Sequence, residues 1–245
     1  MIPRQSPLED RAILFGDRGA SGLSGENTLE SFQLALRLGA TGIETDLLVS
    51  ADGVALLRRS PKTSGLRKRR IVDTDRASLG ESVVSLEELY DAAGTEAHLL
   101  IHVIDHDAVE AAIQTATRFR ALDRLWLASA DLEALQGWRQ RSSLVRLVHE
   151  ASIASIDGGA ERHAATLRSS NVDAVLAPRT HWNGGRTALY HRFRRRCFGT
   201  DAVHERMAVL LLHIGLDGVS SAHPDRLVDA QADISRPDAP EFREQ

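Results

Sequence analysis

Two carboxylates that could bind a cation stand close together early in the chain. Glu44 and Asp46 lie two residues apart in an apolar run that begins at Ile43. If this run is a β-strand, both side chains point to the same face, because side chains alternate along a strand. Carboxylates that close repel one another unless a proton or a cation lies between them. Hard divalent cations such as Mg²⁺ and Ca²⁺ prefer oxygen ligands of this kind. We favour a metal site over a solvent-facing edge strand, because the surrounding residues are apolar.

A second polar pair, Asp17 and Arg18, follows the apolar run 12–15. Polar residues just past the carboxyl end of a strand are where α/β folds keep their chemistry. An amphipathic helix is predicted next, over residues 28–38, with Gly39 ending it. The residues Asn27 to Glu30 have the pattern of a capping box at its start. The sequence thus predicts a strand, a polar loop and a helix.

Taken in order, these segments resemble the glycerophosphodiester phosphodiesterase family. The family reads HRGA, PENT, E-x-D and then a hairpin ending in HDP; this chain reads DRGA at 17–20, GENT at 25–28, ETD at 44–46 and RSP at 59–61. Further motifs at 84–88, 101–104 and 215–224 match in the same order. The resemblance implies an α/β fold, a single (β/α)₈ TIM barrel with a short hairpin after the second strand.

The resemblance also implies roles for the residues that keep the family's types. Arg18 matches the arginine that contacts phosphate, and Glu44 and Asp46 match two metal ligands. The cofactor implied is a divalent cation, Mg²⁺ or Ca²⁺. The implied partner is a small anionic, phosphorylated substrate, and the implied setting is lipid metabolism.

Other family positions carry different residue types, which changes the expected chemistry. The two catalytic histidines fall at Asp17 and Arg59, and the third metal carboxylate falls at His102. Asp17 is a candidate catalytic residue with an ordinary pKa of about 3.9. A bound cation would lower this pKa further, so beside a metal we expect Asp17 to act as a base or an extra ligand rather than as an acid. Arg59 keeps its proton and can only bind an anion. His102 is interpreted as a metal ligand, an acid–base group or a core residue; as a ligand it would suit Mn²⁺, Fe²⁺ or Zn²⁺.

Basic residues at 58–70 could draw a phosphate or diphosphate toward the same site. Arg59 and Lys62 are the predicted substrate-binding residues of this run, while 67–70 are interpreted as solvated surface. His149 and Glu150, after a later strand, form another possible acid–base pair by position alone.

Length and composition agree with one barrel. The chain has 245 residues, near the ~250 typical of this fold, and we expect the barrel over 1–234 and a flexible tail over 235–245. Its single cysteine excludes an internal disulfide. Without a leader-like segment or a long apolar run, we expect a cytoplasmic protein without membrane insertion. The net charge of −4 argues against nucleic-acid binding.

The rest of the chain alternates between strand-like and helical patterns, as a barrel requires. The predicted strands are 12–15, 42–48, 98–104, 125–128, 144–148, 174–177, 197–198 and 218–220. The predicted helices are 28–38, 86–93, 108–119, 132–141, 160–168, 186–195, 204–214 and 224–232.

Three functions are compatible with this pattern. The favoured one is a divergent metal-dependent enzyme that acts on a phosphoester or diphosphate with altered acid–base residues. The second is a barrel repurposed for an elimination or a cyclisation in specialised metabolism. The third is a ligand-binding protein without catalysis, which the missing histidines favour and which the retained Glu44, Asp46 and Arg18 disfavour.

Overall fold

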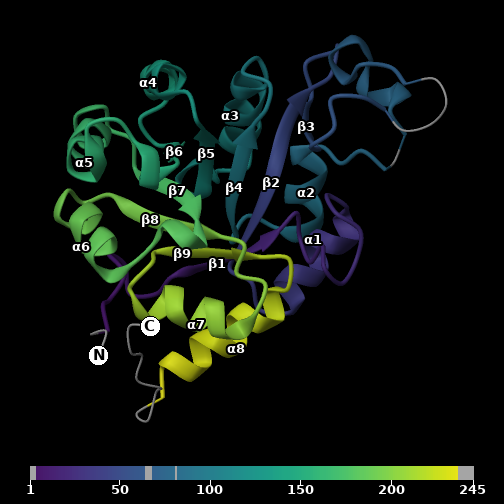
Figure 1. Ribbon diagram of the computed structural model, residues 1–245. Coiled ribbons are helices and arrows are strands. Elements are labelled where there is room, and N and C mark those ends of the chain that lie inside the picture. Colours follow the sequence, from purple (N-terminus) through teal and green to yellow (C-terminus); the bar gives the residue numbers. More distant parts are fainter. Residues whose placement is uncertain (1–3, 64–67, 81, 237–245) are drawn as a thin grey trace.

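The chain folds into a closed ring of eight parallel strands surrounded by helices (Figure 1). The structure, a computed structural model, describes residues 4–63, 68–80 and 82–236. Around the ring the order is β1-β9-β8-β7-β6-β5-β4-β2, and pairing of β1 with β2 closes it. A ninth strand, β3, pairs antiparallel with β2 outside the ring. The predicted (β/α)₈ TIM barrel with a hairpin after its second strand is therefore confirmed.

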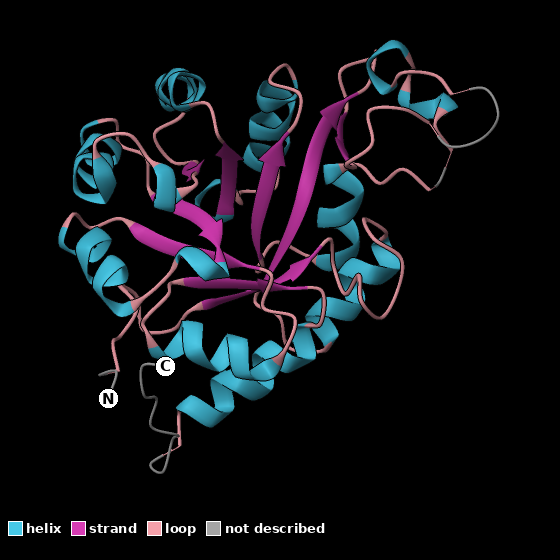
Figure 2. Cartoon of the chain, in the orientation of Figure 1, coloured by secondary structure: helices cyan, strands magenta, loops and turns pink. Residues whose placement is uncertain are grey.

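Figure 2 shows the strands at the centre and the helices around them. The strands are β1 (Ile13–Asp17), β2 (Gly42–Val49), β3 (Ala55–Leu57), β4 (His98–Val103), β5 (Leu125–Ser129), β6 (Arg146–Glu150), β7 (Ala174–Pro178), β8 (Arg196–Thr200) and β9 (Gly218–Ser221). The α-helices are α1 (Leu29–Arg37), α2 (Leu86–Ala93), α3 (Ala108–Arg118), α4 (Leu132–Arg141), α5 (Gly159–Ser169), α6 (Gly184–Arg192), α7 (Glu205–His213) and α8 (Pro224–Ile234). Short 3₁₀ helices are η1 (Ile71–Asp73), η2 (Arg76–Ser78), η3 (Leu122–Arg124), η4 (Ile153–Ser155) and η5 (Arg179–His181).

Every predicted strand and helix lies at its predicted place, with differences at the ends. The largest difference is at α6, expected over 186–195 and observed over Gly184–Arg192. Its start is set by Asn183, whose side-chain oxygen accepts a hydrogen bond from the Arg186 backbone N–H at 2.9 Å. Of the predicted tail at 235–245, residues from 237 onward lie outside the described residues.

The predicted cap of α1 was wrong by one residue. Thr28, not Asn27, is the N-cap, and its hydroxyl accepts from the Ser31 backbone N–H at 3.1 Å. The side chain of Asn27 instead turns toward β2, where it accepts from the Thr45 hydroxyl at 2.7 Å. The predicted helix end is confirmed, since Gly39 follows α1 with a φ of +97°.

Aromatic rings fill the interior of the barrel below the ends of the strands. Phe198 packs edge-on against Phe15 and Trp126, with ring centroids 5.5 Å and 5.0 Å apart. Gly218 makes room for this cluster, because a Cβ atom there would lie 2.7 Å from Phe198 and 2.8 Å from Phe15. This apolar cluster fills the barrel directly below its polar end.

The helices of the described residues are all short. None of them has both the length and the apolar character that crossing a membrane requires.

Candidate active site at the barrel mouth

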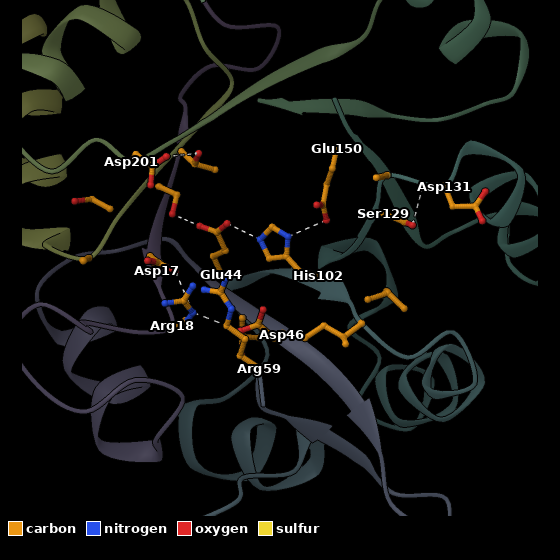
Figure 3. A pocket seen from close by; sticks show the side chains of 18 of the residues that line it. Asp17, Arg18, Glu44, Asp46, Arg59, His102, Ser129, Asp131, Glu150 and Asp201 are labelled. Atoms are coloured by element: carbon orange, nitrogen blue, oxygen red, sulfur yellow. Dashed lines mark hydrogen bonds and ion pairs between the residues drawn. The ribbon is translucent and has the colours of Figure 1, made fainter. Parts of the chain in front are cut away.

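A cavity of about 790 Å³ opens at the carboxyl ends of the ring strands. The labelled residues of Figure 3 that line it are Asp17, Arg18, Glu44, Asp46, Arg59, His102, Ser129, Asp131, Glu150 and Asp201. Several of these residues reach the cavity because side chains alternate between the two faces of a strand. Phe15, Leu100 and Val148 belong to the interior cluster, and the side chains two residues further on, Asp17, His102 and Glu150, line the cavity.

His102 lies between two carboxylates from different strands. Its Nε2 is 2.6 Å from Oε1 of Glu44, and its Nδ1 is 2.8 Å from Oε1 of Glu150. An ionised carboxylate can only accept hydrogen bonds, so the ring donates from both nitrogens and carries a positive charge. Burial opposes this charge, but Glu150 and Glu44 outweigh burial and raise the pKa of His102 well above its ordinary value.

Glu44 is the most enclosed carboxylate of the site. One oxygen accepts from His102, and the other accepts from the hydroxyl of Ser220 on β9. Burial alone would raise the pKa of Glu44, but the hydrogen bond and charge of His102 outweigh it and lower the pKa. Glu44 is therefore an anion held by its neighbours.

Arg18 is held in place by three carboxylates. Its Nη1 lies 2.9 Å from Glu26, and its Nε lies 3.5 Å from Asp46 and 3.9 Å from Asp17. The side-chain amide of Asn27 also reaches Asp46, at 3.4 Å. The guanidinium thus borders the cavity in a fixed position and carries charge that an anion could share.

Asp17 is a partly buried carboxyl group beside Glu44 and Arg18. Burial, with the neighbouring charge of Glu44 as the next cause, raises the pKa of Asp17 to about 6, even though Arg18 acts in the opposite direction. A carboxyl group with this pKa can hold or release a proton near neutral pH. The expectation that Asp17 is a poor acid referred to a site that holds a cation, whose charge would lower the pKa, whereas burial raises it.

The other predicted residues divide between the cavity and its surroundings. Arg59 lines the cavity, whereas Lys62 is exposed, lies outside the lining and pairs with Arg70 in an isolated bridge. Residues 64–67 of the basic run lie outside the described residues. Glu150 faces the cavity, but its neighbour His149 points away and contacts His163 at 2.9 Å.

Two contributors were missed by sequence reasoning. Asn27 was interpreted only as a helix cap, although the same motif places it beside Arg18. Ser220 has no distinctive pattern around it. Its contact with Glu44 follows from the ring closing through β1, which brings β9 and β2 within one strand of each other.

The expected metal ligands share one wall of the cavity and fit a divalent cation by donor type. Glu44 and His102 already meet, and Glu150 accepts from the second ring nitrogen, as carboxylates behind metal-binding histidines do. Asp46 lies on the same face of β2 and directs one oxygen at Arg18. By donor type the residues present would suit such a cation once it replaced the Nε2 proton of His102, with Asp46 shared between the cation and Arg18.

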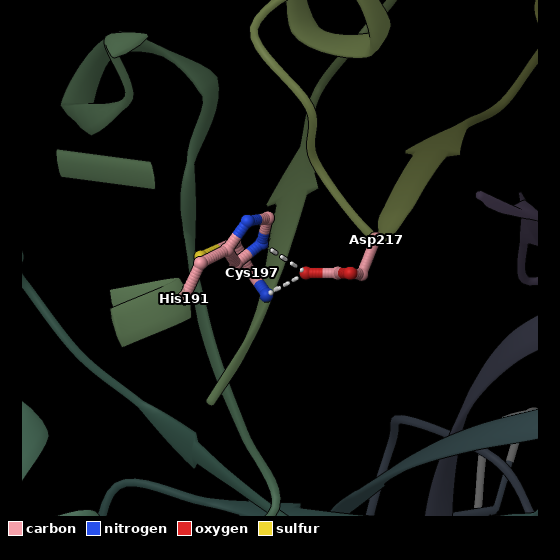
Figure 4. A group of neighbouring side chains, drawn as sticks. All are labelled: His191, Cys197 and Asp217. Carbon is pink, nitrogen blue, oxygen red and sulfur yellow. Dashed lines mark hydrogen bonds and ion pairs between the residues drawn. The ribbon is translucent and has the colours of Figure 1, made fainter. Parts of the chain in front are cut away.

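Within the described part of the chain, a tighter cluster of metal-ligand atoms lies far from the mouth. His191, Cys197 and Asp217 bring such atoms within 4.8 Å of one another (Figure 4). The oxygens of Asp217 are already occupied: one accepts from the Leu8 backbone N–H, and the other accepts from His191 and the Cys197 backbone N–H. Burial raises the pKa of the Cys197 thiol well above its ordinary value. We interpret this cluster as structural, because Asp217 joins the N-terminal segment, α6 and β8 through these hydrogen bonds.

The closed parallel barrel, with charged residues of both signs around the cavity at its mouth, defines a TIM-barrel protein. Residues 18–114 match the sequence model of the Glycerophosphoryl diester phosphodiesterase family. Over this segment, which is less than half of the chain, the sequence is similar to that family.

Curated relatives match over short segments. Mouse glycerophosphodiester phosphodiesterase domain-containing protein 4 is 43% identical over 56 residues, which is 23% of this chain and 9% of that protein. Mouse glycerophosphoinositol inositolphosphodiesterase is 40% identical over 88 residues, 36% of this chain and 16% of that protein. The matched segments thus span less than a fifth of each relative.

Solved structures match over nearly the whole chain. A glycerophosphodiester phosphodiesterase from Thermotoga maritima has a TM-score of 0.78 at 18% identity, covering 90% of this chain and 99% of its own. A phosphodiesterase from Oleispira antarctica, in complex with the product sn-glycerol-3-phosphate, has a TM-score of 0.78 at 18% identity, covering 92% and 99%. At these identities the likeness shows the shared fold.

Proposed function

We propose that this chain is a divergent phosphodiesterase-like enzyme that acts on the phosphoester or diphosphate bond of a small phosphorylated substrate. One observation carries the proposal: a single cavity joins two arginines, Arg18 and Arg59, to an acid of near-neutral pKa, Asp17. The match of residues 18–114 to the family model and the complex of the Oleispira enzyme with sn-glycerol-3-phosphate support a substrate of this kind.

Each residue has a separate task in this proposal. Arg18, held by Glu26 and Asp46, orients the phosphoryl group, and Arg59 neutralises its charge from the hairpin side. Asp17 transfers a proton to or from the reacting oxygen, as the family's histidine would.

A divalent cation would be held by Glu44, Asp46 and His102. It would stabilise negative charge that develops on the phosphoryl oxygens. Mg²⁺ or Ca²⁺ follows from the family, while the imidazole of His102 favours Mn²⁺, Fe²⁺ or Zn²⁺. Ser220 restrains Glu44 from the opposite side, so this carboxylate is pre-organised for either ion.

A second candidate is an elimination or cyclisation of a phosphorylated substrate with a hydrocarbon part. Ile104 and Val203 line the cavity and are 44% and 41% exposed, which is unusual for large apolar side chains at a charged mouth. These side chains would contact the apolar part while Arg18 and Arg59 bind the phosphate.

The test is turnover by the full chain with Mg²⁺ or Mn²⁺, using glycerophosphodiesters and organic diphosphates and following phosphate, glycerol 3-phosphate and olefin products. We expect Asp17→Asn to lower kcat about 100-fold or more. Asp131→Asn, in the same cavity, should leave kcat within about twofold, because asparagine still caps α4 at that position. Full activity of Asp17→Asn would refute the role of Asp17, and no binding of glycerol 3-phosphate or inorganic diphosphate would refute the proposed substrate class.

A further inference from the structure

The contact between β4 and β6 at the mouth points to a further positioning residue. We propose that Glu150 fixes the tautomer and orientation of His102, so that Nε2 of the ring faces the cation site beside Glu44. This inference rests on the proposed function, because it assumes that His102 takes part in holding the cation.

The geometry of the barrel makes this contact specific. His102 and Glu150 come from strands that are separated in the ring by β5. The register places Ala128 between His102 and Val148, and Ala130, just past the end of β5, lines the cavity. Both are alanines, so neither side chain occupies the space in which the imidazole and the carboxylate meet at 2.8 Å.

The end of β6 is held from its outer face. His149 points away from the cavity, where its ring contacts the Ala130 carbonyl at 3.2 Å and His163 at 2.9 Å. Because successive residues of a strand point to opposite faces, anchoring His149 outside fixes the direction of Glu150 inside. The position of Glu150 is thus built into the packing of β6.

The chemistry explains why a carboxylate is needed there. An imidazole binds a cation through a bare nitrogen, so a cation would have to replace the proton on Nε2 of the His102 ring, and the proton left on Nδ1 must find an acceptor. At His102 that acceptor is Glu150, and the remaining nitrogen, Nε2, lies 2.6 Å from Glu44. Removing the acceptor would free the ring to turn or to adopt the other tautomer.

The first experiment is calorimetric titration of the full chain with Mn²⁺. We expect Glu150→Gln, which keeps the size of the side chain, to weaken Mn²⁺ binding by about 10- to 100-fold. The control Asp131→Asn removes a different acidic group of the same cavity and should leave the affinity within about twofold. Unchanged affinity in Glu150→Gln, while Glu44→Ala abolishes binding, would overturn the role of Glu150 and leave the proposed metal site intact.

A double-mutant cycle separates positioning from a general effect of charge or folding. His102→Glu supplies a carboxylate ligand that needs no partner behind it, so Glu150→Gln in that background should cost less than about twofold in Mn²⁺ affinity. An equal loss in both backgrounds would overturn the proposal. Mn²⁺ binding that survives Glu44→Ala would instead overturn the metal site of the proposed function.

Discussion

At the scale of single residues, the mouth of this barrel shows how surroundings change what a side chain can do. Burial, with the charge of Glu44 as the next cause, raises the pKa of Asp17 to about 6. That value lies near the ordinary pKa of histidine, about 6.5. A carboxyl group can therefore supply proton transfer near neutral pH at a position where the residue type alone argues against it.

Arg59 and Lys62 allow a direct test of which basic side chain after the hairpin contacts the ligand. Arg59 lines the cavity and Lys62 does not. We expect Arg59→Ala to weaken binding of glycerol 3-phosphate about tenfold, equivalent to about 1.4 kcal/mol, because a charge-assisted contact is lost. The matched variant Lys62→Ala should change affinity less than about twofold. Calorimetry measures both, and equal losses would mean that the hairpin acts only through its total charge.

At the scale of elements, a chain of hydrogen bonds links α6, α5 and β6. At one end of this series, His149 Nε2 donates to the carbonyl oxygen of Ala130, because a carbonyl oxygen can only accept. Burial lowers the pKa of both histidines and so favours neutral rings. With neutral rings, His149 Nδ1 accepts from His163 Nε2, at 2.9 Å, and His163 Nδ1 accepts from the hydroxyl of Tyr190, at 2.7 Å.

Because His163 is neutral in this series of hydrogen bonds, we expect acid to lower the stability of the folded protein. Burial, followed by the neighbouring His149, lowers the pKa of His163 to about 4 from the ordinary 6.5. As the pH falls below about 6.5 the unfolded chain binds the proton first, so stability that is fully present above 6.5 is lost toward pH 4. The melting temperature of the parent protein should therefore fall over this range.

The variant His163→Gln cannot take up this proton and should show a smaller loss of melting temperature between pH 7 and 4.5. His204→Gln, at an exposed histidine, should keep the pH dependence of the parent. If His163→Gln and the parent lose the same number of degrees over this range, His163 does not contribute to acid sensitivity.

At the scale of the whole molecule, hydrogen bonds to Asp217 stabilise the end of the barrel opposite the mouth. This carboxylate is 2% exposed and accepts from the backbone N–H groups of Leu8 and Cys197 and from the ring of His191. It thereby joins the N-terminal segment, α6 and β8 at the point where β9 begins. These contacts hold the last strands of the ring in place for closure against β1.

Replacing Asp217 should destabilise the entire barrel. Asp217→Ala leaves several buried donors without an acceptor, which we expect to cost about 3 kcal/mol. For a chain of this length the melting temperature should fall by roughly 6–12 °C. The matched variant Asp229→Ala, at an exposed position on α8, should shift it by less than about 2 °C. Thermal unfolding followed by circular dichroism checks both, and a shift of less than about 2 °C in Asp217→Ala would contradict this structural role.

Much of the architecture follows from local patterns. The alternation of strand-like and helical segments, the order of the motifs and the polar residues at strand ends predict the barrel and place Asp17, Arg18, Glu44 and Asp46 at its mouth. These predictions succeed because side-chain periodicity and turn chemistry act over a few neighbouring residues. The cap of α1 failed for the same reason, since Thr28 and Asn27 are equally suitable as local caps and only the packing against β2 selects between them.

The sequence by itself therefore determined the fold, the resemblance to a family and most of the residues at the mouth. Only the tertiary structure decided that His102 meets Glu150 across β5, that Lys62 lies outside the cavity and that Asp17 titrates near neutral pH. The contact and the pKa depend on strand register, which joins residues 48 positions apart, and on the burial of charge by groups from several strands. No local pattern carries that information, because neighbours in space are chosen by closure of the whole ring.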